Sequence, residues 1–203
     1  HPDDRSTALS RMKRLTSLVL AMMVSNAAAG DGGAGTGLLI DDFAGNDAVS
    51  RLGTRWRVVT DRVMGGVSDA AMSLRQIDGR SALCLSGDVS LANNGGFVQV
   101  NLDLSPTGLM DASRFDGVRL IVRGNGQIYN LHLKTAATTM PWQSYRAELK
   151  AGPSWQEVQL PFDTFQPHRL VPALDVTRLR RLGIVAIGRA MQADICVAEV
   201  GFY

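Results

Sequence analysis

The 203-residue sequence is poor in the residues that build metal and haem centres, with three His and two Cys scattered along the chain. That scarcity excludes zinc-ribbon and haem-attachment spacings. The sequence also lacks a GxSxG elbow, an HExxH motif and a phosphate-binding glycine loop. The sequence therefore predicts no catalytic residues, no metal ligands and no cofactor.

The chain has little excess charge of either sign. The formal net charge is +2, and all of it comes from the first 29 residues, because the remaining residues carry equal numbers of acidic and basic groups. Nucleic acids and anionic membranes need a concentrated basic surface, so neither is predicted as a partner. Hydrophobic residues make up 45% of the chain and charged residues 20%, which is typical of a globular domain.

The segment from Met12 to Ala29 has the order of a secretory signal peptide. Lys13 and Arg14 precede about ten apolar residues, and three alanines follow. The apolar run is shorter than the roughly 20 residues that span a bilayer as a helix, and no Cys follows it. We expect residues 1–29 to be an upstream remnant plus the signal peptide, and 30–37 a flexible Gly-rich mature N-terminus. Localisation would be periplasmic or secreted, without a stable membrane anchor after cleavage. The alternative to a signal peptide is an ordinary N-terminal helix.

Export would expose the two cysteines to an oxidising compartment. Cys84 and Cys196 lie in apolar, strand-like segments near opposite ends of the body. A disulfide between early and late strands is one interpretation. Two buried thiols that behave as small apolar residues are the other, and the sequence favours the second.

From Leu38 onward the hydrophobic pattern has a period of two, with turn residues between short apolar runs. No amphipathic helix of ten residues is indicated, only short helical turns at 111–115 and 175–181. Asp78-Gly79 and Gly124–Gly126 are typical of hairpin turns. The pattern predicts an all-β fold, a single jelly-roll β-sandwich over residues 38–203, with strands at 38–43, 56–60, 70–77, 81–86, 96–104, 117–123, 127–134, 144–149, 155–161, 182–188 and 195–203.

The first and last strands of such a sandwich commonly lie close together. That arrangement would bring Asp41, Asp42 and Glu199 towards one end, but two or three carboxylates are a weak case for a structural calcium. His132 lies within a strand between two leucines, where a satisfied structural histidine is the simpler interpretation.

Three loop regions are more polar or glycine-rich than plain strand connection requires. They contain DRVMGGVS (61–68), NNGGF (93–97), and the pair RGNGQIY (123–129) and MPWQSYR (140–146). Gly and Asn permit left-handed backbone and close approach of another group. Arg beside Asp can present a planar donor fork, or tie two loops together through backbone carbonyls. Aromatics among Arg and amides can stack on a sugar or a protein, or form one wet face of a sheet.

The DRVMGGVS and NNGGF blocks, in this order and with their flanking strands, resemble the complex I intermediate-associated protein 30 family. The resemblance runs from about Leu38 to Tyr203. It implies a galactose-binding-domain-like jelly roll, in a superfamily that also contains carbohydrate-binding modules. Eukaryotic members assist assembly of respiratory complex I in mitochondria, whereas the leader here resembles a bacterial secretory signal.

These observations favour a non-catalytic binding or chaperone-like assembly module that recognises a protein surface or a glycan in the cell envelope. The alternative is an exported carbohydrate-active hydrolase with acids drawn from Asp61, Asp88 or Asp103. The first needs aromatics and amides on an open face, and the second needs two carboxylates in one cleft. We expect one binding surface that contains Asp61, Arg62, Gly65, Gly66, Ser68, Asn93, Asn94, Gly95 and Gly96, with Arg123, Tyr129 and Trp142 nearby.

Overall fold

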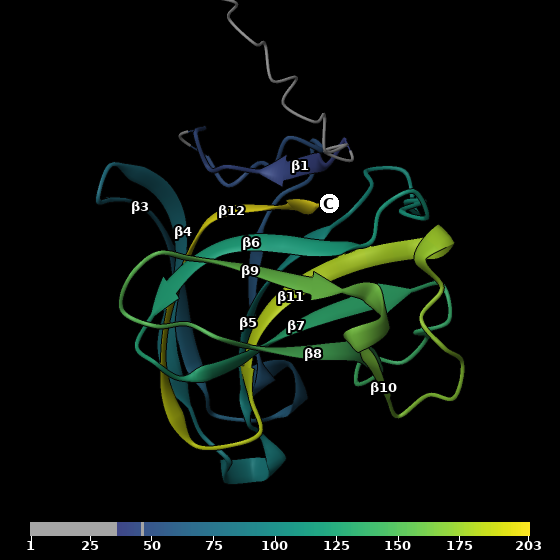
Figure 1. Ribbon diagram of the computed structural model, residues 1–203. Coiled ribbons are helices and arrows are strands. Elements are labelled where there is room, and N and C mark those ends of the chain that lie inside the picture. Colours follow the sequence, from purple (N-terminus) through teal and green to yellow (C-terminus); the bar gives the residue numbers. More distant parts are fainter. Residues whose placement is uncertain (1–35, 46) are drawn as a thin grey trace, which may run out of the picture. The chain divides into compact units, whose positions relative to one another are not determined.

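The computed structural model describes residues 36–45 and 47–203, and the predicted signal peptide lies outside them. The described residues form an antiparallel sandwich of two six-stranded sheets (Figure 1). Their only helices are short 3₁₀ turns, at Asp61–Met64, Ala92–Asn94, Phe162–Thr164 and Val176–Arg178. In this part of the chain no helix is long and apolar enough to cross a membrane.

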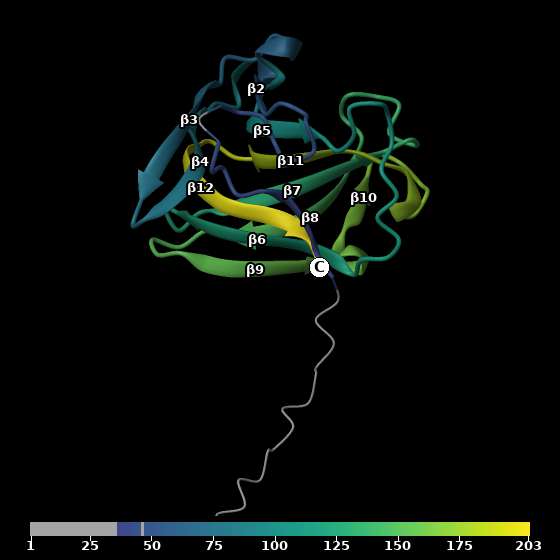
Figure 2. The ribbon, with the colours of Figure 1, turned by 90° about the horizontal axis from the view of Figure 1, so that it is seen from above.

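The first sheet runs in the order β3-β4-β12-β6-β9, and β1 pairs with the end of β12. Figure 2 shows β6, β9 and β12 on one side of the molecule and β2 and β5 on the other. The strands of this sheet are β1 (Leu38–Asp41), β3 (Asp69–Ile77), β4 (Arg80–Val89), β6 (Gly117–Gly124), β9 (Gln156–Pro161) and β12 (Met191–Phe202).

The second sheet runs in the order β10-β8-β7-β11-β5-β2. Every pairing in it is antiparallel. Its strands are β2 (Arg57–Thr60), β5 (Phe97–Asp103), β7 (Ile128–Thr135), β8 (Ser144–Lys150), β10 (Gln166–His168) and β11 (Leu179–Ile187).

Alternate residues of both sheets meet in one core. Because side chains of a strand point to opposite faces in turn, the apolar half of each alternating pattern is buried between the sheets. The buried side chains include Leu83, Leu85, Val118, Leu120, Ile195 and Val197 from the first sheet, and Val98, Val100, Leu102, Leu131, Leu133, Leu182 and Ile184 from the second. Polar residues on the other face of the second sheet are therefore left to face outward.

The all-β prediction is confirmed, and each of the eleven expected strands is present with shifted ends. The sequence pattern did not predict β10, which contains Pro167 and therefore lacks one backbone hydrogen-bond donor. It lies at the sheet edge, where that donor is not needed. The Asp78-Gly79 hairpin is confirmed, with positive φ at both residues. The hairpin expected at Gly124–Gly126 is wrong, because this loop carries the chain from β6 in one sheet to β7 in the other.

The first and last strands pair as expected, with Leu38 opposite Phe202. The three carboxylates expected near that end each have a partner within the protein. Asp41 accepts a 2.8 Å hydrogen bond from the Trp56 indole, Asp42 pairs with an arginine at 2.6 Å, and Glu199 pairs with another arginine. Burial raises the pKa of Asp41. The described residues contain no group of three metal-binding side chains.

Candidate functional site

The two motif loops meet at one buried carboxylate. Asp61 is fully buried, and its Oδ1 accepts a hydrogen bond from the Ser68 backbone N–H at 2.9 Å. Its Oδ2 accepts from the N–H of Gly96 at 2.6 Å, from the N–H of Phe97 at 3.4 Å and from the Ser68 hydroxyl. We call this arrangement of residues 61–68 and 93–97 the Asp61 junction.

The hydrogen bonds decide the charge state of Asp61. Burial alone would raise the pKa of this carboxyl, but the donors from Ser68, Gly96 and Phe97 outweigh it and hold the pKa below its ordinary value. The carboxylate is therefore ionised at neutral pH. All its contacts lie within the protein, so its role in the structure is to join two loops.

The glycines of both motifs make room for that carboxylate. A Cβ on Gly66 would lie 2.3 Å from Asp61 Cγ, and a Cβ on Gly95 would lie 2.4 Å from Asp61 Oδ2. Gly65 has a φ of +87°, which ends the short 3₁₀ turn in the left-handed region. Glycine at 66 and 95 is thus required by close approach to a side chain, not by a ligand.

Arg62 and the two asparagines lie on the outside of the junction. Arg62 Nε donates to the Ser68 carbonyl at 2.9 Å, and its terminal nitrogen lies 3.9 Å from Asp69. Asn93 and Asn94 are exposed and have φ of 54° and 56°. The structure thus brings nine of the twelve expected site residues together.

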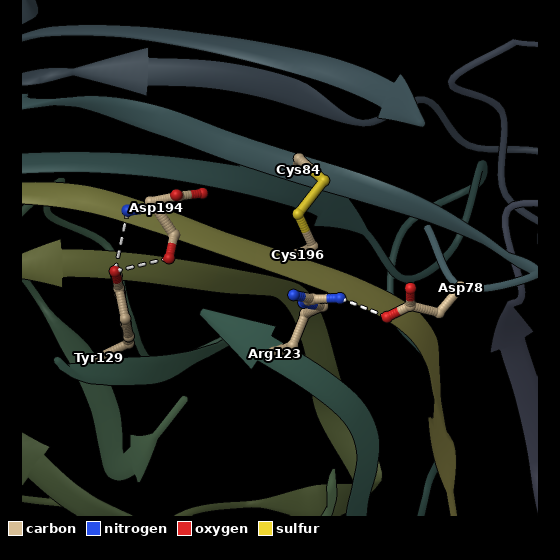
Figure 3. Close-up of a disulfide and its surroundings, with 6 residues drawn as sticks. All are labelled: Asp78, Cys84, Arg123, Tyr129, Asp194 and Cys196. Atoms are coloured by element: carbon tan, nitrogen blue, oxygen red, sulfur yellow. Dashed lines mark hydrogen bonds and ion pairs between the residues drawn. A yellow bond between two sulfur atoms is a disulfide. The ribbon is translucent and has the colours of Figure 1, made fainter. Parts of the chain in front are cut away.

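Arg123 and Tyr129 form no hydrogen bond or ion pair with these nine residues, and their partners lie elsewhere. Tyr129 is fully buried, and its hydroxyl donates to the Asn125 side chain. The same hydroxyl accepts from the Asp194 N–H at 2.9 Å (Figure 3). Arg123 lies in the other sheet and pairs with Asp78 at 2.6 Å. Aromatic and basic residues lie close together in this part of the sequence, but β6 and β7 belong to different sheets, so closeness along the chain does not place their side chains on one surface.

Figure 3 also shows that the two cysteines form a disulfide between β4 and β12. Cys84 and Cys196 are direct cross-strand partners, with Cα atoms 4.0 Å apart. The favoured interpretation of two unpaired thiols is therefore wrong.

A groove of about 250 Å³ lies on the outer face of the second sheet. Trp142, the twelfth expected residue, lines it, together with Val63, Met64 and Phe97 from the Asp61 junction. The side chains at the rim are apolar and exposed: Val63 at 72%, Met64 at 51% and Trp142 at 46%. The remaining lining comes from Val59, Gln99, Asn101, His132, Lys134, Pro141, Ser144, Arg146, Arg181, Val185 and Ile187.

The floor of the groove follows one row of residues across the sheet. Asn101 of β5 is opposite Gly183 of β11, Gly183 is opposite His132 of β7, and His132 is opposite Arg146 of β8. Directly opposed residues have Cβ atoms about 5 Å apart, so these groups form a continuous line. Gly183 contributes no side chain between Asn101 and His132, and the side-chain end of Gln99 lies 3.0 Å from the position that a Cβ would take there.

Two polar atoms of this row, one on each side of Gly183, have no partner among the described residues. Asn101 is 4% exposed and His132 is 8% exposed, yet Asn101 Oδ1 and His132 Nε2 form no hydrogen bond. Buried polar atoms are nearly always satisfied, so these two atoms are available to a water, a hydroxyl group or an amide. Burial, and then the charges of Arg146 and Lys134, lower the pKa of His132 to about 3. The imidazole is therefore neutral at physiological pH.

Three cations line the groove, and two of them have no carboxylate partner in the described residues. Arg181 is bound to Asp103 at 2.7 Å. Lys134 Nζ donates to two backbone carbonyls, Pro141 at 2.7 Å and Gln143 at 3.0 Å. Burial, and then the charges of Arg181, Arg146 and Arg180, lower the pKa of Lys134 to about 8.

The three acids considered for a hydrolase do not converge. Asp61 is enclosed in the junction, and Asp88 lies on a strand of the first sheet. Asp103 binds both Arg57 and Arg181. Burial alone would raise the pKa of Asp103, but the two guanidinium groups lower it.

The sequence over residues 42–195 matches the family model of complex I intermediate-associated protein 30. The chain belongs to this family. A search of curated proteins finds no match. The resemblance based on the motif blocks is thus confirmed, and in this family member those blocks form the Asp61 junction.

Solved structures similar to this chain include several carbohydrate-binding modules. The family 11 module of a cellulosomal cellulase of Clostridium thermocellum has a TM-score of 0.64 and 12% identity, covering 82% of this chain and 93% of its own. The same family 11 module in complex with a β-1,3-1,4-mixed-linked tetrasaccharide has a TM-score of 0.62 and 13% identity, covering 82% and 94%. A family 30 module of another cellulosomal cellulase of that organism has a TM-score of 0.59 and 12% identity, covering 82% and 97%. Identities this low establish the shared sandwich fold alone.

Sequence reasoning found the rim of the groove in this family member but not its floor. Asn101, His132, Lys134 and Arg146 lie in three strands, β5, β7 and β8, whose sequences have the ordinary alternating pattern. A signal was present, because polar residues two positions apart recur on the same face in each of them. Knowing that these strands are neighbours required the structure.

Proposed function

We propose that the protein is a non-catalytic binding module whose groove takes a short stretch of saccharide. The observation that carries this proposal is the pair of unpartnered buried atoms, Asn101 Oδ1 and His132 Nε2, on either side of Gly183. Sugar hydroxyls both donate and accept, so one hydroxyl group between them satisfies an acceptor and a neutral imidazole at once.

The rim supports the same ligand class. A pyranose ring has an apolar face as well as hydroxyls, and aromatic side chains bury such faces. Trp142 is 46% exposed at the groove, in a position where a ring can stack on it. A volume of about 250 Å³ is slightly below the 300–1,000 Å³ of drug-sized sites, so it suits a short part of a chain. The carbohydrate-binding modules of the same fold, one of them solved with a tetrasaccharide, support the proposal.

A protein partner is the second candidate. Val63 and Met64 are 72% and 51% exposed, and exposed apolar side chains in a cluster are typical of protein contacts. The family description, an intermediate-associated protein of complex I, also favours an assembly role. The Cys84–Cys196 disulfide supports our further proposal that the protein is exported, because disulfides persist in oxidising compartments.

The test is a glycan array followed by titration calorimetry with the oligosaccharides that bind. Gly183→Val places a branched side chain between Asn101 and His132, and the group nearest to the new Cβ is the flexible end of Gln99 at 3.0 Å. We expect this variant to keep its melting temperature and to lose at least tenfold in affinity.

The matched aromatic pair is Trp142→Ala and Trp155→Ala. Trp155 packs around the disulfide, on the first sheet, so its substitution should leave glycan binding unchanged. Binding that survives Gly183→Val and Trp142→Ala would contradict the proposed groove. An array with no binder, together with a protein partner captured through Val63 and Met64, would favour the second candidate.

A further inference from the structure

The cations of the groove raise a question about the charge of the ligand. The lining contains Lys134, Arg146 and Arg181, and no Asp or Glu from the described residues. Asp103 already neutralises Arg181, but neither Lys134 nor Arg146 forms an ion pair in this part of the chain. The groove therefore has two positive charges without a counter-charge.

Arg146 has unused hydrogen-bonding capacity at the groove. Its Nε donates to the Ser144 hydroxyl at 2.9 Å, and its two terminal nitrogens form no hydrogen bond with any described residue. A guanidinium group presents those nitrogens as a planar pair that matches the two oxygens of a carboxylate. Lys134 is held beside it by the carbonyls of Pro141 and Gln143, so a second cation is fixed at the same place.

This arrangement is costly in the free protein. Burial and neighbouring positive charges lower the pKa values of both Lys134 and Arg146, which means that the fold disfavours their charged forms. An anion between Lys134 and Arg146 offsets the repulsion between their positive charges and favours the charged form of each. Ionisable groups whose pKa is shifted by burial and by neighbouring charges are concentrated at functional sites.

We propose that the ligand is an acidic saccharide whose carboxylate pairs with Arg146 and Lys134, while its hydroxyls bind Asn101 and His132. This inference rests on the proposed function, since it assigns a charge to the saccharide in the same groove. His132 is neutral and directly opposite Arg146, so it contributes a hydrogen bond next to the carboxylate without adding charge.

The experiment uses matched acidic and neutral ligands with the full chain. The probes are tetrasaccharides of galacturonate, of mannuronate and of alternating glucuronate and N-acetylhexosamine, each also as its methyl ester. A neutral mixed-linked β-glucan tetrasaccharide completes the set. We expect at least one free acid to bind at least tenfold more tightly than its ester, with an affinity that falls as salt is raised.

The variants separate specific pairing from net charge. Arg146→Gln and Lys134→Gln should each abolish the preference for acid over ester, and Arg146→Lys should restore part of it. Arg75→Gln removes the same charge from β3 of the other sheet, where the side chain is exposed, and should leave the preference intact.

Equal affinity for acids and esters, with groove-dependent binding of the neutral glucan, would overturn the charge assignment and leave the binding module in place. If no saccharide binds and an acidic peptide binds in a manner that Gly183→Val abolishes, both the charge assignment and the saccharide proposal fail. These two failures are therefore distinguishable.

Discussion

Removing the Asp61 carboxylate should destabilise the protein strongly. Asp61→Ala leaves the backbone N–H groups of Ser68, Gly96 and Phe97 without an acceptor. An unsatisfied buried donor costs about 1–3 kcal/mol, and the 3.4 Å bond to Phe97 is the weakest of the three. We expect a loss of about 2–5 kcal/mol, since water can enter part of the vacated space. In a domain of this size, each kcal/mol lowers the melting temperature by about 2–4 °C, so the midpoint should fall by about 10 °C.

Asp61→Asn tests whether the charge or the shape of the side chain matters. An amide keeps one acceptor oxygen but turns an NH₂ group towards N–H donors, so this variant should lose most of the same stability. Asp88→Ala is the matched control, because Asp88 lies exposed on β4. This substitution should change the melting temperature by no more than about 1–2 °C. Thermal denaturation followed by circular dichroism measures all three variants.

The pH dependence gives a separate check on the same carboxylate. The pKa of Asp61 is lowered in the folded protein, so the unfolded chain takes up the proton first as the pH falls. Its stabilising contribution is complete above the unfolded pKa of about 3.9 and is lost as the pH falls through the folded pKa. The gap in melting temperature between the parent and Asp61→Asn should therefore narrow below about pH 4. A gap under 2 °C or so at neutral pH would refute the junction as a stabilising element.

Three further predictions concern other parts of the molecule. Reducing the Cys84–Cys196 disulfide, which closes a loop with a sequence separation of 112, should cost about 2–5 kcal/mol, measured by denaturation with and without reductant. Tyr129→Phe should cost about 1–3 kcal/mol, because the Asp194 N–H loses its acceptor, and should leave ligand affinity unchanged in calorimetry. Affinity for an anionic saccharide should fall as the pH rises through about 8, because Lys134 loses its proton there, and the fall should be absent in Lys134→Gln.

The sheet residues could be predicted because alternation is a local signal. In Phe97 to Asp103, each step changes the face, and the structure buries Val98, Val100 and Leu102 in the core as that pattern requires. The disulfide could not be predicted in the same way. Cys84 and Cys196 become neighbours only because β12 pairs with β4 in one particular register, and alternation within a strand carries no information about its neighbours.

The same limit explains why only part of the candidate site was found. The junction residues lie in two short segments that are unusually rich in glycine and polar residues. The sequence alone therefore predicted them as candidates, without the topology. The floor of the groove consists of single residues from separate strands, and His132 looked like a structural histidine between leucines. Its buried, unpartnered Nε2 is a property of the assembled sheet, which no window of sequence contains.

This division also bears on what family membership implies about the ligand. The motif blocks on which the resemblance rests build a junction whose central carboxylate and glycines contact one another and not the groove floor. The junction also contributes Val63, Met64 and Phe97 to the rim of the groove. The groups that would distinguish one ligand from another belong to β5, β7, β8 and β11, outside those blocks. The family match covers residues 42–195, and so contains the junction and the groove floor alike; the ligand must therefore be argued from the floor residues of this chain and not from membership.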